Sequence, residues 1–400
     1  MATKIGFLLG SGISLKAGLP TTKEITKNII SGEGIIRHTD GSYYLGNCSK
    51  NRSCSYIGCC KSLISLLNVK LAIFNSKKIE FNYEDLYFII DQIYNSIIGE
   101  FENPIADQFM ESLKPDVEMI LHNDPSETEN RDYEWLMREA KHYIQDIVWR
   151  MLLKKTSSTN YLKSISDSCL DADIEKVDLF TLNHDLLLES FLEKQRIEYD
   201  IGFGPKYNDV RYWNPMILEE SNKKVRLIKL HGSINWIVYR ANKYSSRNYS
   251  VGLVDIGKTD IWYTKSPSGD YQNPIEGRPQ ILIGTSNKIL QYSGELFIDL
   301  HSLFRRSLRE IDHLIICGYG FGDKGINSQV NAWMYLPSVN HMTIIHPEPD
   351  NLLKNARGLI QKNWESWEKE GQLTIINKKI EDTSWVEIKR TLMNKCQESS

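Results

Sequence analysis

Polar side chains that could take part in catalysis stand directly after short apolar segments of this sequence. Asn183 follows one such segment and His231 ends another. An asparagine amide can orient a water molecule or a ligand hydroxyl without forming an ion pair, and a histidine can accept a proton near neutral pH. Asp185 lies two residues beyond Asn183 and would face the same side in extended backbone, so we expect it to play a supporting role. These three residues are the candidate catalytic group.

The competing interpretation of the same residues is structural. Asn183 is also a good N-cap for the helix predicted after it, and a lone histidine at the end of a strand more often satisfies local backbone groups. Glycine follows His231, however, and leaves the space that an open pocket requires.

Two glycine loops offer backbone N–H groups to an anion. The first is GSGIS, residues 10–14, and the second is GYGFGD, residues 318–323. A helix beginning near Thr21-Thr22 would add its positive N-terminal end. Two such loops at one edge of a sheet fit an extended ligand with two phosphates, that is, a dinucleotide. Taken alone, GSGIS does not match the GxGxxG pattern, and a tight turn explains it better.

The elements that must position these residues are short runs that are continuously apolar rather than alternating. Such runs are typical of strands covered on both faces, and helical patterns separate several of them. The pattern predicts an open α/β sheet with crossover helices, in which ligands bind at the carboxyl ends of the strands. The runs are 4–10, 177–183, 225–232, 279–284, 313–320 and 342–347, with a further one at 373–378.

A long stretch between the first two runs contains no convincing strand. Its apolar residues recur at helical spacing, for example in 83–99 and 134–153. We therefore predict an α/β domain made of residues 1–30 and 170–400, with a helical module inserted at 31–169. The polar, tyrosine-rich stretch 239–280 is interpreted as a long loop or a small lobe.

Composition excludes several classes of protein. The chain has 400 residues and a formal net charge of −3 at pH 7, which gives no general attraction to nucleic acid. No apolar run approaches the roughly 20 residues that span a bilayer, so we expect a cytoplasmic protein without a membrane segment. Four of the seven cysteines lie close together, at 48, 54, 59 and 60, but their spacing favours reduced thiols over a zinc site, and we expect no metal.

Four motifs in a fixed order resemble those of a known family. GSGIS with the following AGLP, then TLNHD, KLHGS and GYGFGD, resemble the motifs of sirtuin-type NAD-binding proteins. The fuller forms TLNHDLLLE and KLHGSINW are similar to those of bacterial sirtuin-like NADases of antiphage defence. The resemblance covers about 1–30 and 170–350. It implies a Rossmann-like open parallel sheet with NAD⁺ as substrate.

The chain departs from sirtuin deacylases in one respect. Those enzymes carry a four-cysteine zinc ribbon after the LHG segment, whereas this chain has no cysteine between Cys169 and Cys317. The stretch 239–280 occupies the place of the ribbon, which counts against protein deacylation. GTS at 284–286 matches a sirtuin phosphate motif by its letters, but the order of the motifs favours Gly318-Tyr319-Gly320.

The resemblance implies an NAD⁺ glycohydrolase in which Asn183, His231 and Asp185 form the catalytic group. The first glycine loop would hold the diphosphate, the second would line the phosphate and adenosine side, and His346 would lie near the adenine ribose. The implied cofactor-binding residues are Gly10, Ser11, Gly12, Ser14, Thr22, Gly318, Tyr319, Gly320, Phe321, Asp323 and His346.

Two other functions remain open at this point. One is a group transferase, either a deacylase or an ADP-ribosyltransferase, using the same cleft. The other is a non-enzymatic sensor of NAD or ADP-ribose within an assembly, although a sensor does not need both Asn183 and His231. Because an NADase that is always active would kill its host, we expect a homo-oligomer whose activity is controlled by assembly through the helical module or by a partner. The resemblance suggests a HerA-type ATPase as that partner.

Overall fold

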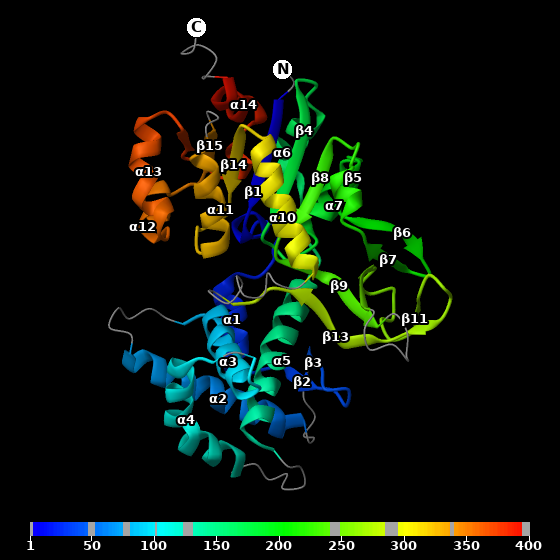
Figure 1. Cartoon of the computed structure of the whole chain (residues 1–400), viewed down its shortest axis with the longest axis vertical. Coiled ribbons are helices and arrows are strands. Elements are labelled where there is room, and N and C mark those ends of the chain that lie inside the picture. Colours follow the sequence, from blue (N-terminus) through cyan, green and yellow to red (C-terminus); the bar gives the residue numbers. More distant parts are fainter. Residues whose placement is uncertain are drawn as a thin grey trace. The chain divides into compact units, whose positions relative to one another are not determined.

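A computed structural model gives the fold of this chain. It describes residues 3–46, 53–74, 81–100, 102–122, 131–240, 249–284, 295–336 and 340–393. The chain forms two compact units (Figure 1). The sheet unit comprises residues 1–18, 155–282 and 289–400, and the helical unit comprises 19–154 and 283–288. The domain boundaries predicted at residues 30/31 and 169/170 stay a prediction.

The sheet unit is built on a seven-stranded parallel sheet, with the order β16-β15-β14-β1-β4-β8-β5. All five residues of β14, HLIIC, are buried, which explains why the runs are apolar without alternation. This confirms the predicted α/β fold class. The strands are β1 (Thr3–Leu9), β4 (Ile174–Thr181), β5 (Tyr199–Asp200), β8 (Val225–Lys229), β14 (His313–Cys317), β15 (His341–Ile345) and β16 (Leu373–Ile376).

One predicted run lies in a different sheet. The segment 279–284 contributes to β13 (Pro274–Ile281), which pairs antiparallel with β9 (Gly232–Arg240). An apolar run indicates burial but does not tell which sheet buries it, and the two-residue strand β5 was too short to recognise. The antiparallel sheet has the order β13-β9-β10-β7-β6. Its other strands are β6 (Phe203–Tyr207), β7 (Val210–Trp213) and β10 (Tyr249–Val254).

The described residues of the stretch 239–280, which are 239–240 and 249–280, belong to a small lobe with its own core. Val210, Ile237, Tyr239 and Val254 are fully buried against one another there. A further pair of short strands, β11 (Thr264–Lys265) and β12 (Tyr271–Gln272), completes the described part of this lobe.

Helices connect and cover the parallel strands. α10 turns an apolar face to the sheet, where the ring of Phe304 meets Phe180 of β4 edge-on at 4.7 Å between centroids. The helices are α6 (Lys163–Leu170), α7 (Leu187–Lys194), α8 (Met216–Glu219), α10 (Glu295–Glu310), α11 (Lys324–Met334), α12 (Pro349–Asn355), α13 (Leu359–Lys369) and α14 (Trp385–Met393), with the 3₁₀ turns η1 (Ser11–Ser14), η2 (Asn160–Leu162) and η3 (Ile380–Asp382).

The helical unit is mostly helical, as predicted, but it also contains a hairpin that the sequence did not reveal. β2 (Ile35–Arg37) and β3 (Tyr43–Leu45) pair antiparallel. Strands of three residues are too short to give a periodic signal. The five helices of the described part are α1 (Thr22–Ser31), α2 (Ser53–Phe74), α3 (Tyr83–Ile97), α4 (Pro104–His122) and α5 (Tyr133–Leu152).

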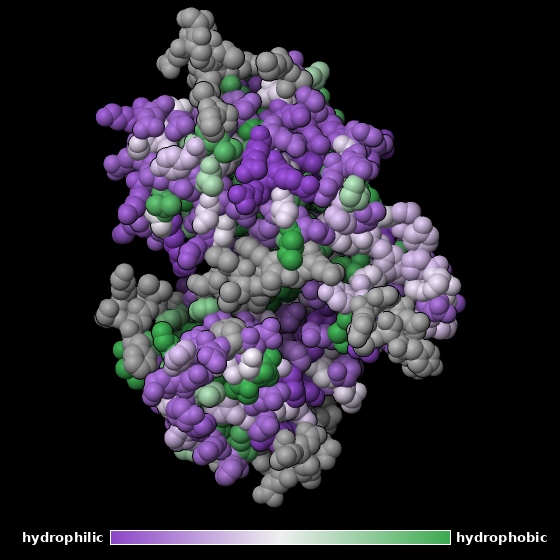
Figure 2. Space-filling view, in the orientation of Figure 1, coloured by the Kyte–Doolittle hydropathy of each residue, from purple (hydrophilic) through white to green (hydrophobic). Residues whose placement is uncertain are grey.

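The helix α2 differs from the expectation that no apolar run is long enough to span a bilayer. Its segment Ser55–Ile73 has 19 residues with a mean hydropathy of 1.4, and 33% of the stretch is buried. Length and composition alone are weak evidence for a membrane span, because core helices pass the same test. Figure 2 shows apolar side chains on this unit's surface, and Val69, Ile73, Ile105 and Met119 are among the exposed ones.

Candidate active site

The order of the parallel strands reverses beside β1. From β1 the chain continues to β4 and β8 on one side, and later to β14, β15 and β16 on the other. In open α/β sheets the ligand crevice lies at such a reversal, outside the carboxyl ends of the strands. The two glycine loops follow β1 and β14, so the structure brings both to this point.

The glycines of the two loops allow the loops to contact each other. The N–H of Gly10 donates to the carbonyl of Cys317 at 3.0 Å, and the N–H of Gly12 donates to Gly318 at 2.9 Å. A Cβ on Gly12 would lie 2.7 Å from the Cα of Gly318, which has a φ of 67°. These two N–H groups are therefore not available to an anion. Their glycines serve the close approach of backbone to backbone.

Space for a ligand remains beside other residues of these loops. Ser11 and Gly320 are exposed. A Cβ added to Gly320 or Gly322 would meet no atom of the described residues within 4 Å. The described residues therefore leave the space beside Gly320 and Gly322 of the second loop unfilled.

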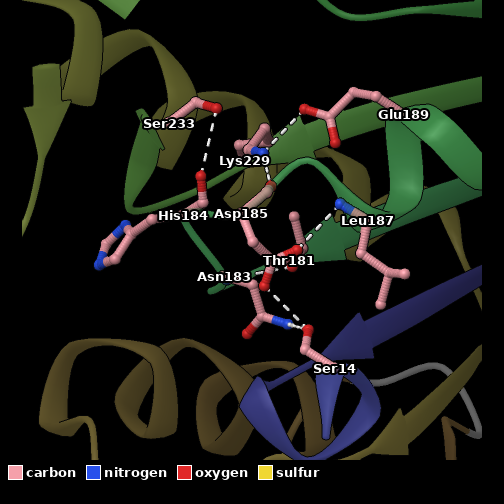
Figure 3. Close-up of polar contacts among 9 residues, drawn as sticks. All are labelled: Ser14, Thr181, Asn183, His184, Asp185, Leu187, Glu189, Lys229 and Ser233. Atoms are coloured by element: carbon pink, nitrogen blue, oxygen red, sulfur yellow. Dashed lines mark hydrogen bonds and ion pairs between the residues drawn. The ribbon is translucent and has the colours of Figure 1, made fainter. Parts of the chain in front are cut away.

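The side chains of Asn183 and Asp185 meet at one hydroxyl group (Figure 3). The Nδ2 of Asn183 donates to Ser14 Oγ at 3.0 Å, and Ser14 Oγ donates to Asp185 Oδ2 at 2.8 Å. Asn183 does not cap the following helix, which was the structural interpretation of this residue. Asp185 is in its place, because its Oδ1 accepts from the N–H of Leu187 at 3.0 Å. All three polar residues are buried.

The orientation of the Asn183 amide follows from its partners. Its Nδ2 also lies 3.1 Å from the carbonyl oxygen of Gly10, which can only accept a hydrogen bond. The nitrogen must therefore point to β1, and Oδ1 must point away from it. Among the residues that the structure describes, no side chain or backbone group donates to Asn183 Oδ1. This oxygen is an acceptor held in a fixed direction.

A buried ion pair supports the turn that carries Asp185. The Nζ of Lys229, on β8, lies 2.8 Å from Oε1 of Glu189 on α7 and also donates to the carbonyl of Asp185. Burial raises the pKa of Glu189, and the charge of Lys229 opposes this effect. The pair joins the end of β8 to the first turn of α7 (Figure 3).

His231 lies in the turn from β8 into β9, where the chain leaves the parallel sheet. Gly232 has a φ of 80°, and a Cβ there would lie 2.0 Å from the carbonyl oxygen of Gln280. Only glycine fits this position. The Nε2 of His231 lies 3.2 Å from Oδ2 of Asp323, and both side chains are buried.

Asp323 thus has a role that the sequence did not reveal. Its Oδ1 accepts from the N–H of Ile326 at 3.0 Å and caps α11, while Oδ2 faces His231. The sequence placed Asp323 among cofactor-binding residues. Its position at the start of a helix after the second glycine loop was the available signal, but nothing in the sequence linked it to His231.

Backbone contacts hold the ends of β4 and β8 together. Leu230 donates to the carbonyl of Thr181 at 2.9 Å, and Ile234 donates to that of His184 at 3.0 Å. The rings of His184 and His231 lie 6.3 Å apart between centroids. Asn183 and His231 therefore stand at neighbouring strand ends, as the sequence predicted.

The remaining predicted residues lie in different surroundings. Tyr319 is buried, and its hydroxyl donates to Asn327 Oδ1 at 2.8 Å. Phe321 is fully buried, and its ring faces Trp364 at 5.9 Å between centroids. His346 Nδ1 accepts from the N–H of Glu348 at 3.0 Å. Thr22 begins α1 in the helical unit. The binding roles of these residues stay predictions.

Within the described ranges, no group of three or more His, Cys, Asp or Glu residues could hold a metal ion. Cys59, Cys60, Cys169 and Cys317 are buried, and none of them forms a disulfide within the described residues. Cys48 and the side chain of Cys54 lie outside the described residues, so the interpretation of the four-cysteine group stays a prediction.

One protein family and several solved structures are similar to this chain. Residues 177–370 match a protein family described as a SIR2-like domain. No curated protein matches the chain. Among solved structures, a SIR2 homolog–NAD complex is 13% identical and covers 97% of this chain and 89% of its own, with a TM-score of 0.38. A Sir2 homologue variant with ADP-ribose is 12% identical and covers 98% and 94%, with a TM-score of 0.37.

The match to the family model is confined to residues 177–370. The matched segment begins in β4 and ends beyond the second glycine loop, and it includes Asn183, His231 and Asp323. Residues 177–370 of this chain are thus similar to SIR2-like domains.

Proposed function

We propose that this protein is an NAD⁺ glycohydrolase that cleaves NAD⁺ to nicotinamide and ADP-ribose. The observation that carries the proposal is the arrangement of two groups at neighbouring strand ends of a SIR2-like domain. One is the fixed, available Oδ1 of Asn183, and the other is His231 with Asp323 at 3.2 Å.

The chemistry of this bond suits an asparagine and a histidine. Nicotinamide is cationic in NAD⁺ and leaves as a neutral molecule, so its departure needs no general acid. Ordinary glycoside hydrolysis, by contrast, uses two carboxylic acids. The enzyme has to steady an oxocarbenium-like ribose and to place a water molecule. Asn183 Oδ1 accepts a hydrogen bond from the water or a ribose hydroxyl, and His231 accepts the proton that the water loses.

Asp185 and Ser14 act as positioning residues in this proposal. Their hydrogen bonds fix the amide of Asn183 from the side opposite to the ligand. Asp323 holds the imidazole of His231 and stabilises the imidazolium that forms when the ring takes a proton. No metal is part of the proposed mechanism.

The proposed biological role is the depletion of NAD⁺ in the cytoplasm during phage infection. It is supported by the likeness of TLNHDLLLE, KLHGSINW and GYGFGD to the motifs of antiphage NADases. The solved Sir2 homologues include complexes with NAD and with ADP-ribose. We further propose that the protein works as a homo-oligomer, with a HerA-type ATPase as its partner.

The test is to incubate the purified chain with NAD⁺, with and without the product of its neighbouring gene, and to measure nicotinamide and ADP-ribose. We expect Asn183→Ala and His231→Ala to abolish release. Asn351→Ala, at an exposed position of α12, is the matched control and keeps it. Full activity in either site variant, with the fold intact, would show that the site is assigned wrongly.

A further inference from the structure

A cavity of about 480 Å³ lies between α10 and α11 in the sheet unit, apart from the residues of the proposed catalytic site. Its apolar wall includes Leu308 and Trp333, which are each 2% exposed, and Leu336. The volume falls within the range of about 300–1,000 Å³ that is usual for small-molecule sites. The apolar wall suits an aromatic or aliphatic body.

Two arginines of α10 line the same cavity. Arg305 and Arg309 are four residues apart, so they lie on one face of the helix, and among the described residues neither forms an ion pair. Arg306, between them, differs: its guanidinium pairs with Glu219. The surface over α10 is mostly hydrophilic in Figure 2. The cavity thus presents two positive charges for which the described residues supply no counter-ion.

The polar end of the cavity has an acceptor that no described residue satisfies. His301 Nε2 lies 3.2 Å from the carbonyl of Leu230 and must donate to it, so Nδ1 accepts from Gln329 Nε2 at 3.2 Å. Gln329 Oε1 is then left buried and without a donor. A buried acceptor of this kind is costly unless a ligand or water donates to it.

We propose that this cavity binds a small organic anion and that its occupancy reaches the segment carrying His231 through His301. The anionic group, a carboxylate, sulfonate or phosphate, pairs with Arg305 and Arg309. The body packs on Leu308 and Trp333, and a hydrogen-bond donor meets Gln329 Oε1.

The connection to the catalytic edge runs through three consecutive residues of the chain. Lys229 is bonded to Glu189, Leu230 accepts from His301, and His231 faces Asp323. A ligand that fixes Gln329 also fixes the ring of His301, because the two side chains are bonded. The ring in turn holds Leu230, which precedes His231. The meaning of this connection for catalysis rests on the function proposed above, whereas the binding itself does not.

The binding test uses anilinonaphthalenesulfonate, which carries an anion, an aromatic body and one N–H donor. N-phenylnaphthylamine, its counterpart without the sulfonate, is the matched neutral probe. We expect Arg305→Gln with Arg309→Gln to weaken the binding of the anionic probe at least tenfold, and that of the neutral probe by less than twofold. Arg306→Gln is the control on the same helix and leaves both unchanged. Equal affinity of the anionic probe for the wild type and the double variant would overturn the proposed site.

The connection is tested by hydrogen–deuterium exchange, which does not depend on NAD⁺ hydrolysis. With the anionic probe saturating, we expect amide exchange in residues 229–235 to slow at least threefold, and the double variant to show no such change. Slower exchange confined to α10 and α11 would overturn the proposed transmission. If the protein does not hydrolyse NAD⁺, the proposed function is contradicted. The probe-binding test and the exchange test still give a result, because neither depends on hydrolysis.

Discussion

The Nε2 atom of His231 lies 3.2 Å from Oδ2 of Asp323, which joins the end of β8 to the loop after β14. At this distance the carboxylate forms an ion pair with the imidazole once the ring has taken a proton. The same carboxylate caps α11 through its other oxygen. One side chain therefore fixes both a helix and the proposed base.

Replacing Asp323 by asparagine separates these two roles. Asparagine still caps α11, but it carries no charge to stabilise an imidazolium. We expect kcat for NAD⁺ hydrolysis to fall about 100-fold, with KM changed by less than about twofold. Asp350→Asn, at an exposed position of α12, is the control. A wild-type kcat in the Asp323 variant would remove Asp323 from the mechanism.

Ser14→Ala takes away the hydroxyl between Asn183 and Asp185. Two buried polar groups then lose a partner, which costs about 1–3 kcal/mol of the free energy of unfolding. The amide of Asn183 keeps its bond to Gly10 but is held less firmly. We expect lower NAD⁺ turnover together with lower stability, measured by steady-state kinetics and urea unfolding. The exposed Ser11→Ala should leave the free energy of unfolding unchanged; an equal loss of stability in both variants would show that the hydroxyl of Ser14 has no special role.

Two glycine substitutions distinguish packing from ligand space. In Gly12→Ala the new Cβ lies 2.7 Å from backbone of Gly318, so the two loops must move apart. We expect a loss of about 1–3 kcal/mol in the free energy of unfolding. Gly320→Ala meets no described atom within 4 Å and should retain stability to within about 0.5 kcal/mol. If Gly320 leaves room for NAD⁺, its variant binds NAD⁺ more weakly in calorimetry, whereas unchanged affinity would exclude Gly320 from the binding surface.

His301 makes the stability of the sheet unit depend on pH. Burial and the neighbouring His231 lower the pKa of His301 from 6.5 to about 3. Below pH 6.5 the histidine takes up a proton in the unfolded chain but not in the folded chain. The contribution of His301 to the free energy of unfolding is therefore complete above pH 6.5 and is lost as the pH falls toward 3. Between pH 7 and pH 5 we expect wild type to lose about 2 kcal/mol more than His301→Gln in urea unfolding. A variant at exposed His122 should follow the wild type, and parallel curves for all three would contradict the lowered pKa of His301.

Assembly is expected to activate the enzyme. A partner shifts the balance between silent and active forms only by binding the active form more tightly. A difference of about 3 kcal/mol changes that balance roughly a hundredfold. NAD⁺ turnover per chain should therefore rise with protein concentration, and again when a HerA-type ATPase is added. Turnover that is high at the lowest concentration and unchanged by both steps would rule out this control.

The positions of the strands were predictable because burial on both faces leaves a local signature. β1 and β14 are apolar without interruption, and their small or polar ends mark the edge of the sheet. The segment 279–284 carries the same signature in an antiparallel lobe, so the signature reports burial and not the identity of the sheet. The three-residue strands β2 and β3 carry too few residues to show any period.

The residue types of the site were predictable, but their partners were not. Asn183 and His231 were recognised from their places at strand ends. The bond from Asn183 to Ser14 joins residues 169 positions apart, and the pairing of His231 with Asp323 also depends on the full sheet. The glycines of GSGIS indicated close approach of another group, and the backbone that Gly10 and Gly12 contact is that of Cys317 and Gly318, about 300 residues later in the chain. Such long-range choices appear only once the strands are in register.

The central position of β1 has a consequence for protein synthesis. β1 leaves the ribosome first, but its two neighbours in the sheet, β4 and β14, are made much later. In a nascent chain that ends before Gly318, the loop whose carbonyl groups accept from the N–H groups of Gly10 and Gly12 is incomplete. His231 likewise has no Asp323 to pair with. Closure of such distant contacts is slow and comes late in folding. A growing chain therefore lacks part of the proposed catalytic edge until translation has passed β14 and reached Asp323.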